Sequence, residues 1–192
     1  IYSTQNTDIQ TKTENEFEKS KYSLASKNGG NSSQAAMVII DHKTGYVTGC
    51  TGGLGKKTEP RSLNRATQSI RQTGSAIKPI AVLAPAISKK MITAASIYDD
   101  TERDFAEGYH PTDYNPSLGK VTVRRAVESS QNIPFVEIME KLKPSKSIKF
   151  LEKMGVTTLT EEDNNLVLAL GGLQKGISPL EMAGAYATIA ND

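Results

Sequence analysis

The sequence predicts a mixed α+β fold, because one short hairpin is followed by a series of helices. Apolar residues 35–40 form a strand-sized run, and a turn and a second short strand follow directly. From Ser75 onward, apolar residues recur at helical spacing instead. A two-stranded hairpin is marginal alone, so we expect the first strand to need more partners and the domain to continue beyond Asp192.

Composition and charge are those of an ordinary soluble globular protein. The 192 residues are 37% hydrophobic and 23% charged, enough for one domain or a large part of a bigger one. The net charge of +2 gives no indication of a nucleic-acid partner. No run approaches the roughly 18 apolar residues of a membrane span, and the polar start is not a signal peptide. Because the chain starts at Ile1 and not at a methionine, an upstream segment could have been removed.

The residues present give no reason to expect a cofactor or a metal ion. Cys50 is the only cysteine, which excludes an internal disulfide and disfavours a cysteine-based metal site. The two histidines, His42 and His110, lie far apart in turn-like sequence. We therefore expect surface histidines, rather than metal ligands or the base of a Ser-His dyad.

The N-terminal third is predicted to contain a polar linker, residues 1–34, and then the hairpin. The turn of the hairpin contains Gly45, which supplies a positive φ. The expected elements are, in order, a short helix around residues 9–17, a loop over 27–33, a buried strand over 35–40, a turn over 41–45, a returning strand over 46–50 and a loop to Arg61.

The start of the first long helix is fixed by a proline. Pro79 has no N–H and is tolerated only in the first turn, so the helix begins at or just before Ser75. Pro85 lies deeper and should kink the helix. The face expected to be buried carries Ile77, Ile80, Ala81, Ala84 and Ile87. The later elements are an ordered loop over 99–120, a short helix over 121–128 that residues 129–132 interrupt, helices starting at Pro134 and Pro144, a cap at Gly155 and a last helix started by the capping box at 178–181.

Ser75 and Lys78 are the first residues that could carry out chemistry together. Three residues apart on a helix, they share one face. A serine hydroxyl is a poor nucleophile until a base removes its proton, and a neutral lysine amine is such a base. Moving a lysine pKa from about 10.4 to about 7 takes roughly 4–5 kcal/mol, which desolvation or a nearby cation can supply. An ordinary helix N-terminus shows the same Ser-x-x-Lys pattern by chance.

Ser130 and Asn132 form the second candidate pair. A serine hydroxyl can relay a proton to a leaving amine, and an asparagine amide can hold a substrate carbonyl or the lysine. The pair lies in a short break between two apolar-faced helices, where buried polar groups must find partners. The alternative is a plain helix end, in which Asn132 caps the helix that starts near Pro134.

Two other motif matches are set aside because of where they lie. Ser117-Leu118-Gly119-Lys120 is a second Ser-x-x-Lys, but it lies in a turn, where the two side chains need not face each other. Lys43-Thr44-Gly45 looks like the Lys-Thr-Gly element of the serine-lysine transferases. It precedes the serine and lies in the hairpin turn, whose chemistry explains its glycine.

Taken together, these segments resemble the transpeptidase domain of class A, or bifunctional, penicillin-binding proteins. The resemblance covers residues 35–192, and residues 1–34 correspond to the linker before that domain. It implies the penicillin-binding-protein and serine β-lactamase-like fold, an antiparallel sheet flanked by helices, here as an N-terminal portion. The matching segments are Met37 to Asp41, Thr44 to Val47, Gly52-Gly53, Asn64 to Gln68, Arg71 to Pro79, Val121 to Pro134, Leu168 to Gly172, Gly176 to Ala183 and Ala185 to Ala187.

The resemblance implies a role for each candidate residue. Ser75 would be the acylated nucleophile, and Lys78 the base that activates it. Ser130 would pass a proton to the departing D-alanine, and Asn132 would orient the peptide carbonyl and Lys78. Gly74, Ser75 and Asn132 would contact the substrate, with the Ser75 N–H as half of an oxyanion hole. The substrate would be the D-Ala-D-Ala end of a peptidoglycan stem peptide, and β-lactam antibiotics would acylate Ser75 as mimics of it.

The same resemblance implies parts outside this sequence. A Lys-Thr/Ser-Gly strand is expected after Asp192, as the remainder of the domain. A glycosyltransferase domain and an N-terminal anchor are expected upstream, which would place the enzyme on the extracytoplasmic face of the bacterial cytoplasmic membrane. Thr73 stands where relatives usually carry proline. The alternatives are a DD-carboxypeptidase or β-lactamase of the same fold, in which water replaces the acceptor amine, and a non-catalytic domain that binds β-lactams or peptidoglycan.

Overall fold

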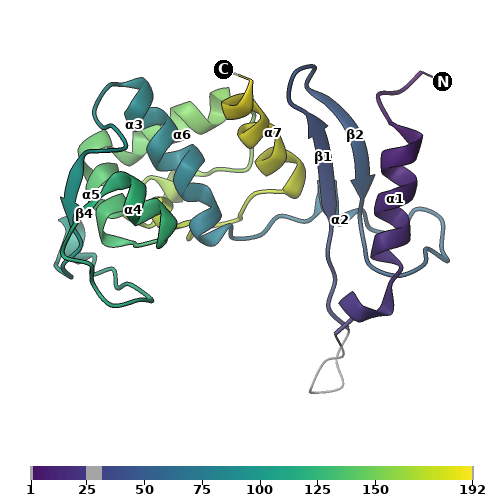
Figure 1. The fold of residues 1–192 in the computed structure, drawn as a ribbon, viewed down its shortest axis with the longest axis horizontal. Helices are drawn as coiled ribbons and strands as arrows, with labels where there is room; N and C mark the ends of the chain where they lie inside the picture. Colours follow the sequence, from purple (N-terminus) through teal and green to yellow (C-terminus); the bar gives the residue numbers. More distant parts are fainter. Residues whose placement is uncertain (1, 25–31, 192) are drawn as a thin grey trace. The chain divides into compact units, whose positions relative to one another are not determined.

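A computed structural model describes residues 2–24 and 32–191 of the chain. The chain divides into two compact units, which are described separately. The first comprises residues 1–71 and 177–192, and the second residues 72–176. Figure 1 shows the elements of both. Most of the loop predicted over residues 27–33 lies outside the described residues.

The first unit is built on the predicted hairpin. β1 (Met37–Asp41) pairs antiparallel with β2 (Tyr46–Thr51), and Gly45 in the turn has φ 72°. The hairpin is confirmed to within a residue or two. The prediction of a buried first strand is wrong, because Met37 is exposed and the rest of β1 is only half-buried. Both strands of a two-stranded ribbon are edge strands, so neither is covered as an interior strand would be.

The predicted N-terminal helix is confirmed as α1 (Thr7–Phe17), and it packs against β2. The side chain of Asn6 caps the helix by accepting two backbone N–H groups. The side-chain amide of Gln10 bonds to the backbone of β2 in the way that a neighbouring strand would. Its Nε2 donates to the Cys50 carbonyl at 2.9 Å, and its Oε1 accepts from the Cys50 N–H at 2.8 Å. An amide side chain thus satisfies backbone groups on the free edge of β2.

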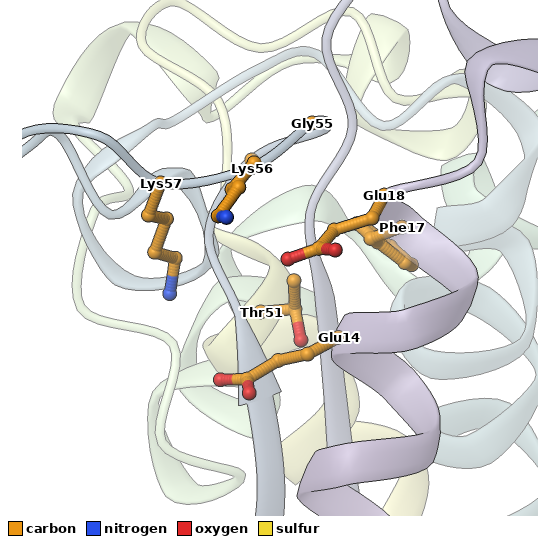
Figure 2. Close-up of a pocket in the computed structure, with 8 residues that line it drawn as sticks. Glu14, Phe17, Glu18, Thr51, Gly55, Lys56 and Lys57 are labelled. Carbon is orange, nitrogen blue, oxygen red and sulfur yellow. The ribbon is translucent and has the colours of Figure 1, made fainter.

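A shallow hollow lies beside the C-terminal end of α1 (Figure 2). Its lining includes two carboxylates, of Glu14 and Glu18, and two lysines, Lys56 and Lys57. The hydroxyl of Thr51 is buried there and has no hydrogen-bond partner among the described residues. The lining of the hollow therefore includes acidic and basic side chains and the buried hydroxyl of Thr51.

The last helix of the chain, α7 (Pro179–Ala190), packs against β1 and against the short helix α2 (Arg65–Gln68). It begins with the predicted capping box. The Ser178 hydroxyl accepts from the Glu181 N–H at 3.2 Å, and the Glu181 carboxylate accepts from the Ser178 N–H at 3.0 Å. These reciprocal bonds confirm the predicted start of this helix.

The second unit is centred on α5 (Ile133–Leu142), which packs against α6 (Pro144–Lys153). Both start within a residue of the predicted prolines, and Gly155, with φ 91°, follows the end of α6. None of the helices in the described ranges is long and apolar enough to cross a membrane. The largest fully buried side chains of this unit are Ile77, Ile80, Val82, Gln131, Ile133, Phe135, Val136, Ile138, Met139, Leu142, Leu151 and Leu168.

The predicted first long helix consists of three different helical segments in series. A 3₁₀ turn, η2 (Gly74–Ile77), leads into a π-helical segment, η3 (Lys78–Leu83), and then into α3 (Ala84–Ser88). A proline at position 85 cannot donate to the carbonyl of Ala81, four residues earlier. That carbonyl instead accepts from the Ser147 hydroxyl of α6 at 2.6 Å. Where a kink is predicted at Pro85, the structure shows a change from π-helix to α-helix between Leu83 and Ala84.

The π-helical segment shifts the buried face of this helix. The predicted face is buried as far as Ala81, but Ile87 is 52% exposed and Ala84 is partly exposed. Val82 and Ala86 are fully buried in their place. A π-helix takes more residues per turn than an α-helix, so the buried positions move along the sequence by about one residue. The prediction for Ile87 is wrong for this reason.

The predicted loop over residues 99–120 is bounded by two strands that the sequence did not indicate. β3 (Ile97–Asp99) pairs antiparallel with β4 (Lys120–Thr122). The helix predicted from residue 121 therefore begins later, as α4 (Val123–Glu128), with Thr122 as its cap. Strands of three residues are too short to show a period of two.

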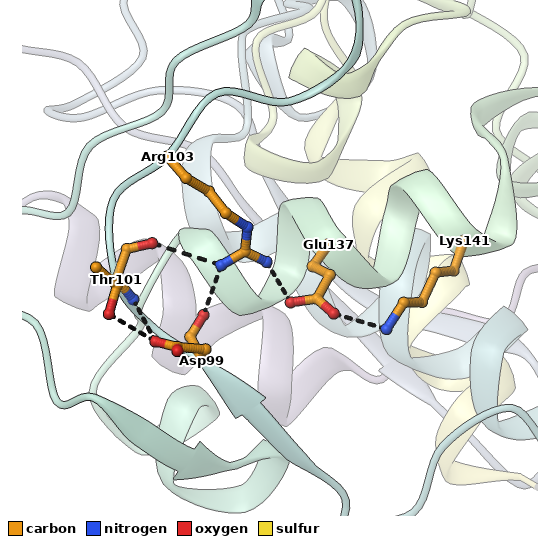
Figure 3. Close-up of polar contacts among 5 residues, drawn as sticks. All are labelled: Asp99, Thr101, Arg103, Glu137 and Lys141. Atoms are coloured by element: carbon orange, nitrogen blue, oxygen red, sulfur yellow. Dashed lines mark hydrogen bonds and ion pairs between the residues drawn. The ribbon is translucent and has the colours of Figure 1, made fainter.

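A set of ionic and polar contacts ties the start of this loop to α5 (Figure 3). The Arg103 guanidinium donates to the Glu137 carboxylate and, at 3.1 Å, to the carbonyl of Asp99. Lys141 donates to the same carboxylate at 2.6 Å. Partly exposed ion pairs contribute about 1 kcal/mol or less each. Their consequence is positional, because they hold the loop beside the helix that follows Asn132.

Candidate active site

Lys78 is a buried lysine whose amine is held by three consecutive residues. The residue is only 3% exposed. Its Nζ donates to the Ser130 carbonyl at 2.8 Å, to the Gln131 carbonyl at 2.9 Å and to Asn132 Oδ1 at 2.7 Å. Ser130 Oγ lies 3.4 Å from the same nitrogen. An ammonium group has three N–H donors, so the three short contacts use all of them.

Burial lowers the pKa of the Lys78 amine to about 8. Desolvation disfavours the charged form, while the negative charges of Asp113 and Asp100 act in the opposite direction and only partly offset it. The ring of Phe135 lies 5.0 Å from Nζ in a cation–π contact, which favours the charged amine. At pH 7, about one Lys78 amine in ten is then neutral, against about one in 2,500 for an ordinary lysine. The shift has the direction that a general base requires.

Ser130 has a backbone conformation that is unusual for a serine. Its φ is 54°, and it follows the end of α4 at the position where glycine is favoured. The Ser130 N–H donates to the Val127 carbonyl at 3.1 Å, and the Gln131 N–H to that of Ala126 at 3.0 Å, which is a Schellman motif. A left-handed non-glycine residue costs about 1–2 kcal/mol. In this strained conformation, the carbonyl and the hydroxyl of Ser130 both face the Lys78 amine.

The side chain of Asn132 does not cap the helix that it precedes. Asn132 is the residue before α5, but its side chain accepts no backbone N–H there. Its Oδ1 instead accepts from Lys78, and its Nδ2 donates to the Thr112 carbonyl at 2.7 Å. The interpretation of Asn132 as an ordinary helix cap is therefore wrong. The Asn132 amide therefore connects Lys78, through Oδ1, to the loop over residues 99–120, through Nδ2.

Ser75 lies one short turn before Lys78, in η2. Side chains three residues apart eclipse each other in a 3₁₀ helix, so the two residues lie on one side of the segment. Ser75 is exposed, and no hydrogen bond joins its hydroxyl to Lys78 within residues 2–24 and 32–191. In unliganded sites such contacts are often long and shorten when substrate binds. The structure thus brings together Lys78, Ser130 and Asn132, and the activation of Ser75 by Lys78 stays a prediction.

Three residues of the loop over 99–120 hold this site, and sequence patterns did not reveal them. The Asp113 carboxylate accepts from the Asn132 N–H, and the Asp100 carboxylate from Gln131 Nε2. Thr112 supplies the carbonyl that Asn132 contacts. The available signal was an ordered loop rich in Asp, Pro and Gly. That signal indicates a shaped loop without indicating which side chains turn inward.

Comparison with known protein families shows which family the chain belongs to. A family model described as the penicillin binding protein transpeptidase domain matches residues 35–192. The chain belongs to the penicillin-binding protein transpeptidase family. The resemblance found in the sequence, and the fold that it implied, are thereby confirmed.

Relatives of this transpeptidase-family chain are penicillin-binding proteins. It is 35% identical to penicillin-binding protein 1A of Clostridium botulinum, over 100% of this chain and 25% of the relative. It is 33% identical to penicillin-binding protein 4 of Bacillus subtilis, over 82% of this chain and 25% of the relative. The chain therefore spans about a quarter of the length of these curated relatives.

Two solved structures of penicillin-binding proteins are similar to this chain. Penicillin-binding protein 1A from Haemophilus influenzae has 26% identity and a TM-score of 0.71, over 86% of this chain and 25% of that one. PonA1 from Mycobacterium tuberculosis, solved in complex with penicillin V, has 23% identity and a TM-score of 0.79, over 99% of this chain and 50% of that one. The second likeness shows the fold alone.

In this transpeptidase-family site, the turn that carries Ser75 is packed against Gly171. Gly171 is buried and has φ 79°. A Cβ atom there would lie 2.3 Å from the Gly74 carbonyl oxygen and 2.6 Å from the Gly74 nitrogen. Glycine is therefore required twice at this position, by its backbone conformation and by the close approach of the Ser75 turn.

Gly171→Ala is expected to destabilise the protein by about 2–4 kcal/mol, because the strain of a positive φ adds to the displacement of the Gly74 backbone. Gly155→Ala is the matched control. Gly155 has φ 91°, but a Cβ atom there would meet open space out to 4 Å, so only the strain of about 1 kcal/mol applies. Urea unfolding of the two variants measures the difference. Equal losses would contradict the packing of Gly171 against the Ser75 turn.

Proposed function

We propose that this chain forms the nucleophile-bearing part of a serine DD-transpeptidase, which cross-links peptidoglycan stem peptides through an acyl-serine intermediate. The observation that carries the proposal is the buried amine of Lys78, held by Ser130 and Asn132 one turn after Ser75. Membership of the penicillin-binding protein transpeptidase family supports the same reaction.

In the proposed acylation step, the neutral amine of Lys78 takes the proton of the Ser75 hydroxyl. Ser75 Oγ attacks the carbonyl carbon of the penultimate D-alanine, and the Ser75 N–H donates to the oxygen that becomes negative. The 3.4 Å separation between Lys78 Nζ and Ser130 Oγ then provides a route for the proton to the departing nitrogen. The C–N bond breaks, terminal D-alanine leaves, and the peptide remains attached to Ser75 as an ester.

In the second step, an amine from a neighbouring stem peptide attacks this ester. Ser130 and Lys78 accept its proton by the same route in reverse, and Ser75 leaves as a free hydroxyl. Asn132, whose Oδ1 accepts from Lys78 at 2.7 Å, would hold the lysine and orient the peptide carbonyl. A β-lactam enters the first step as a substrate mimic, and its ring opens on Ser75.

The greater length of the relatives supports further proposals about the complete protein. We propose that a glycosyltransferase domain and a membrane anchor precede this domain. They would place the site on the extracytoplasmic face of the cytoplasmic membrane. We also propose that a Lys-Thr/Ser-Gly strand completes the site with a second oxyanion donor and a group that binds the substrate carboxylate.

The lifetime of a penicillin adduct tests this function. In the complete protein we expect fluorescent penicillin to label Ser75 and the label to persist for minutes or longer, because the acceptor amine is absent. A β-lactamase of the same fold would release the label within seconds, since water attacks its ester. Gel fluorescence at successive times after removal of free penicillin measures the decay. Rapid release of the label would contradict the transpeptidase proposal and indicate a hydrolase. No labelling at all would favour a non-catalytic domain.

A further inference from the structure

Two acidic side chains behind the Lys78 amine have buried oxygen atoms that lack a donor. Asp100 is fully buried, and its Oδ2 accepts from the Leu118 N–H at 2.8 Å and from Gln131 Nε2. Asp113 Oδ1 accepts from the Asn132 N–H. In the described part of the chain, the second oxygens, Asp100 Oδ1 and Asp113 Oδ2, have neither a hydrogen-bond partner nor contact with solvent.

The Asp100 carboxyl group interacts with that of Asp113 and, together with burial, raises the pKa of Asp113. Two ionised carboxylates close together repel each other, and this repulsion raises the pKa of one of them. A protonated carboxyl group is a donor as well as an acceptor. A proton held between the two unsatisfied oxygens would give each of them a hydrogen-bond partner.

We propose that Asp100 and Asp113 share one proton at neutral pH and act as a positioning pair for the Lys78 site. Asp100 fixes Gln131 and Asp113 fixes Asn132, so the pair holds two of the three residues that contact the lysine amine. Burial and the negative charge of Asp100 raise the pKa of the Asp113 carboxyl, and they outweigh the Asn132 N–H and the Lys78 charge, which lower it.

The shared proton also acts on Lys78. The negative charges of Asp113 and Asp100 both favour the protonated amine. With one proton between them, the pair carries one negative charge instead of two, and its pull on the lysine proton is weaker. The pair can thus hold the site through hydrogen bonds without cancelling the desolvation that makes Lys78 a base. This link to acylation rests on the proposed function, whereas the protonation itself does not.

The shared proton is tested by infrared spectroscopy of the complete protein at pH 7. The carbonyl stretch of a protonated carboxyl group is compared between the wild type and Asp113→Asn. The asparagine oxygen can accept from the Asn132 N–H, and its NH₂ group can donate to Asp100 Oδ1, so the variant needs no proton. We expect the wild-type band to disappear in the variant. A wild type without such a band, or a band that survives in Asp113→Asn, would overturn the proposal.

The positioning role is tested by the rate of acylation by penicillin. Asp113→Ala removes the acceptor for the Asn132 N–H, and we expect a ten- to hundredfold loss, about the cost of a displaced catalytic group. Asp113→Asn restores most of that loss. Asp104→Ala, an exposed acid of the same loop, is the control. Wild-type rates in Asp113→Ala, or an Asn variant as slow as the Ala variant, would overturn the positioning role.

The two tests separate failure of this inference from failure of the proposed function. The infrared band reports the proton whether or not the protein is acylated. If Asp113→Ala does not fold, the infrared band and the acylation rate of Asp113→Asn still test the shared proton and the positioning role. If the wild type is not acylated at all, the proposed function fails while the infrared result stands.

Discussion

Replacement of Ser75 by alanine is expected to abolish the covalent penicillin adduct and to slow acylation at least about a thousandfold. Alanine removes the only atom that the proposed reaction joins to the substrate. Because Ser75 is exposed in a short 3₁₀ turn, the change should leave the fold intact. Mass spectrometry of the intact protein after incubation with penicillin measures the adduct directly.

The second Ser-x-x-Lys sequence of the chain offers a matched control. Ser117 precedes Lys120 by three residues, as Ser75 precedes Lys78, but its hydroxyl donates to the Asp100 carbonyl at 2.7 Å. Lys120 is exposed in β4. Ser117→Ala is expected to gain the mass of one penicillin, as the wild type does. An adduct that survives Ser75→Ala would defeat the assignment of Ser75 as nucleophile.

Lys78→Arg is expected to lower the rate of acylation by at least about a thousandfold, because a guanidinium keeps a positive charge and N–H donors but does not lose a proton in proteins. Lys78→Met should lose the activity too. It should also destabilise the fold by about 1–3 kcal/mol for each buried acceptor left without a donor. Stopped-flow measurement of acylation and urea unfolding separate the two effects.

The comparison between the two lysine variants separates catalysis from structure. If Lys78 only holds the segment over residues 130–132 together, arginine should preserve much of the activity. If it is the base, arginine and methionine should both be inactive. Lys120→Arg, at the exposed lysine of the second Ser-x-x-Lys sequence, is the control and should react as the wild type does. Wild-type acylation by Lys78→Arg would contradict the base assignment.

Elements with strong local signals could be predicted from the sequence. The hairpin turn at Gly45, the prolines that start α5 and α6 and the capping box of α7 each depend on a few neighbouring residues. Such signals depend little on the rest of the chain. For this reason, these boundaries are correct to within a residue or two.

Features that depend on distant residues could not be predicted. The buried face after Lys78 moves from Ile87 to Val82 and Ala86, because the segment is π-helical. The Ala81 carbonyl within this segment accepts from Ser147 of α6, which lies far along the sequence. The strands β3 and β4 are likewise stabilised by each other rather than by any pattern within three residues.

The candidate site shows the same division. Residue types and spacing predict Lys78, Ser130 and Asn132 as site residues, and the structure brings them together at hydrogen-bonding distances. Asp100 and Asp113 were missed, because their contacts cross from a long loop to the residues before α5. Sequence spacing indicates side chains within one helix, whereas these contacts depend on how the loop folds back.

The proposed mechanism depends on Lys78 having a neutral amine at working pH, and direct titration of that amine tests it most directly. NMR of the complete protein with ¹³C-labelled lysine follows each amine through pH 6–12, and the signal missing from Lys78→Arg identifies residue 78. We expect that signal to titrate near pH 8, because the amine is buried and desolvated. A Lys78 signal that titrates near the ordinary lysine value of about 10.4 would contradict the mechanism.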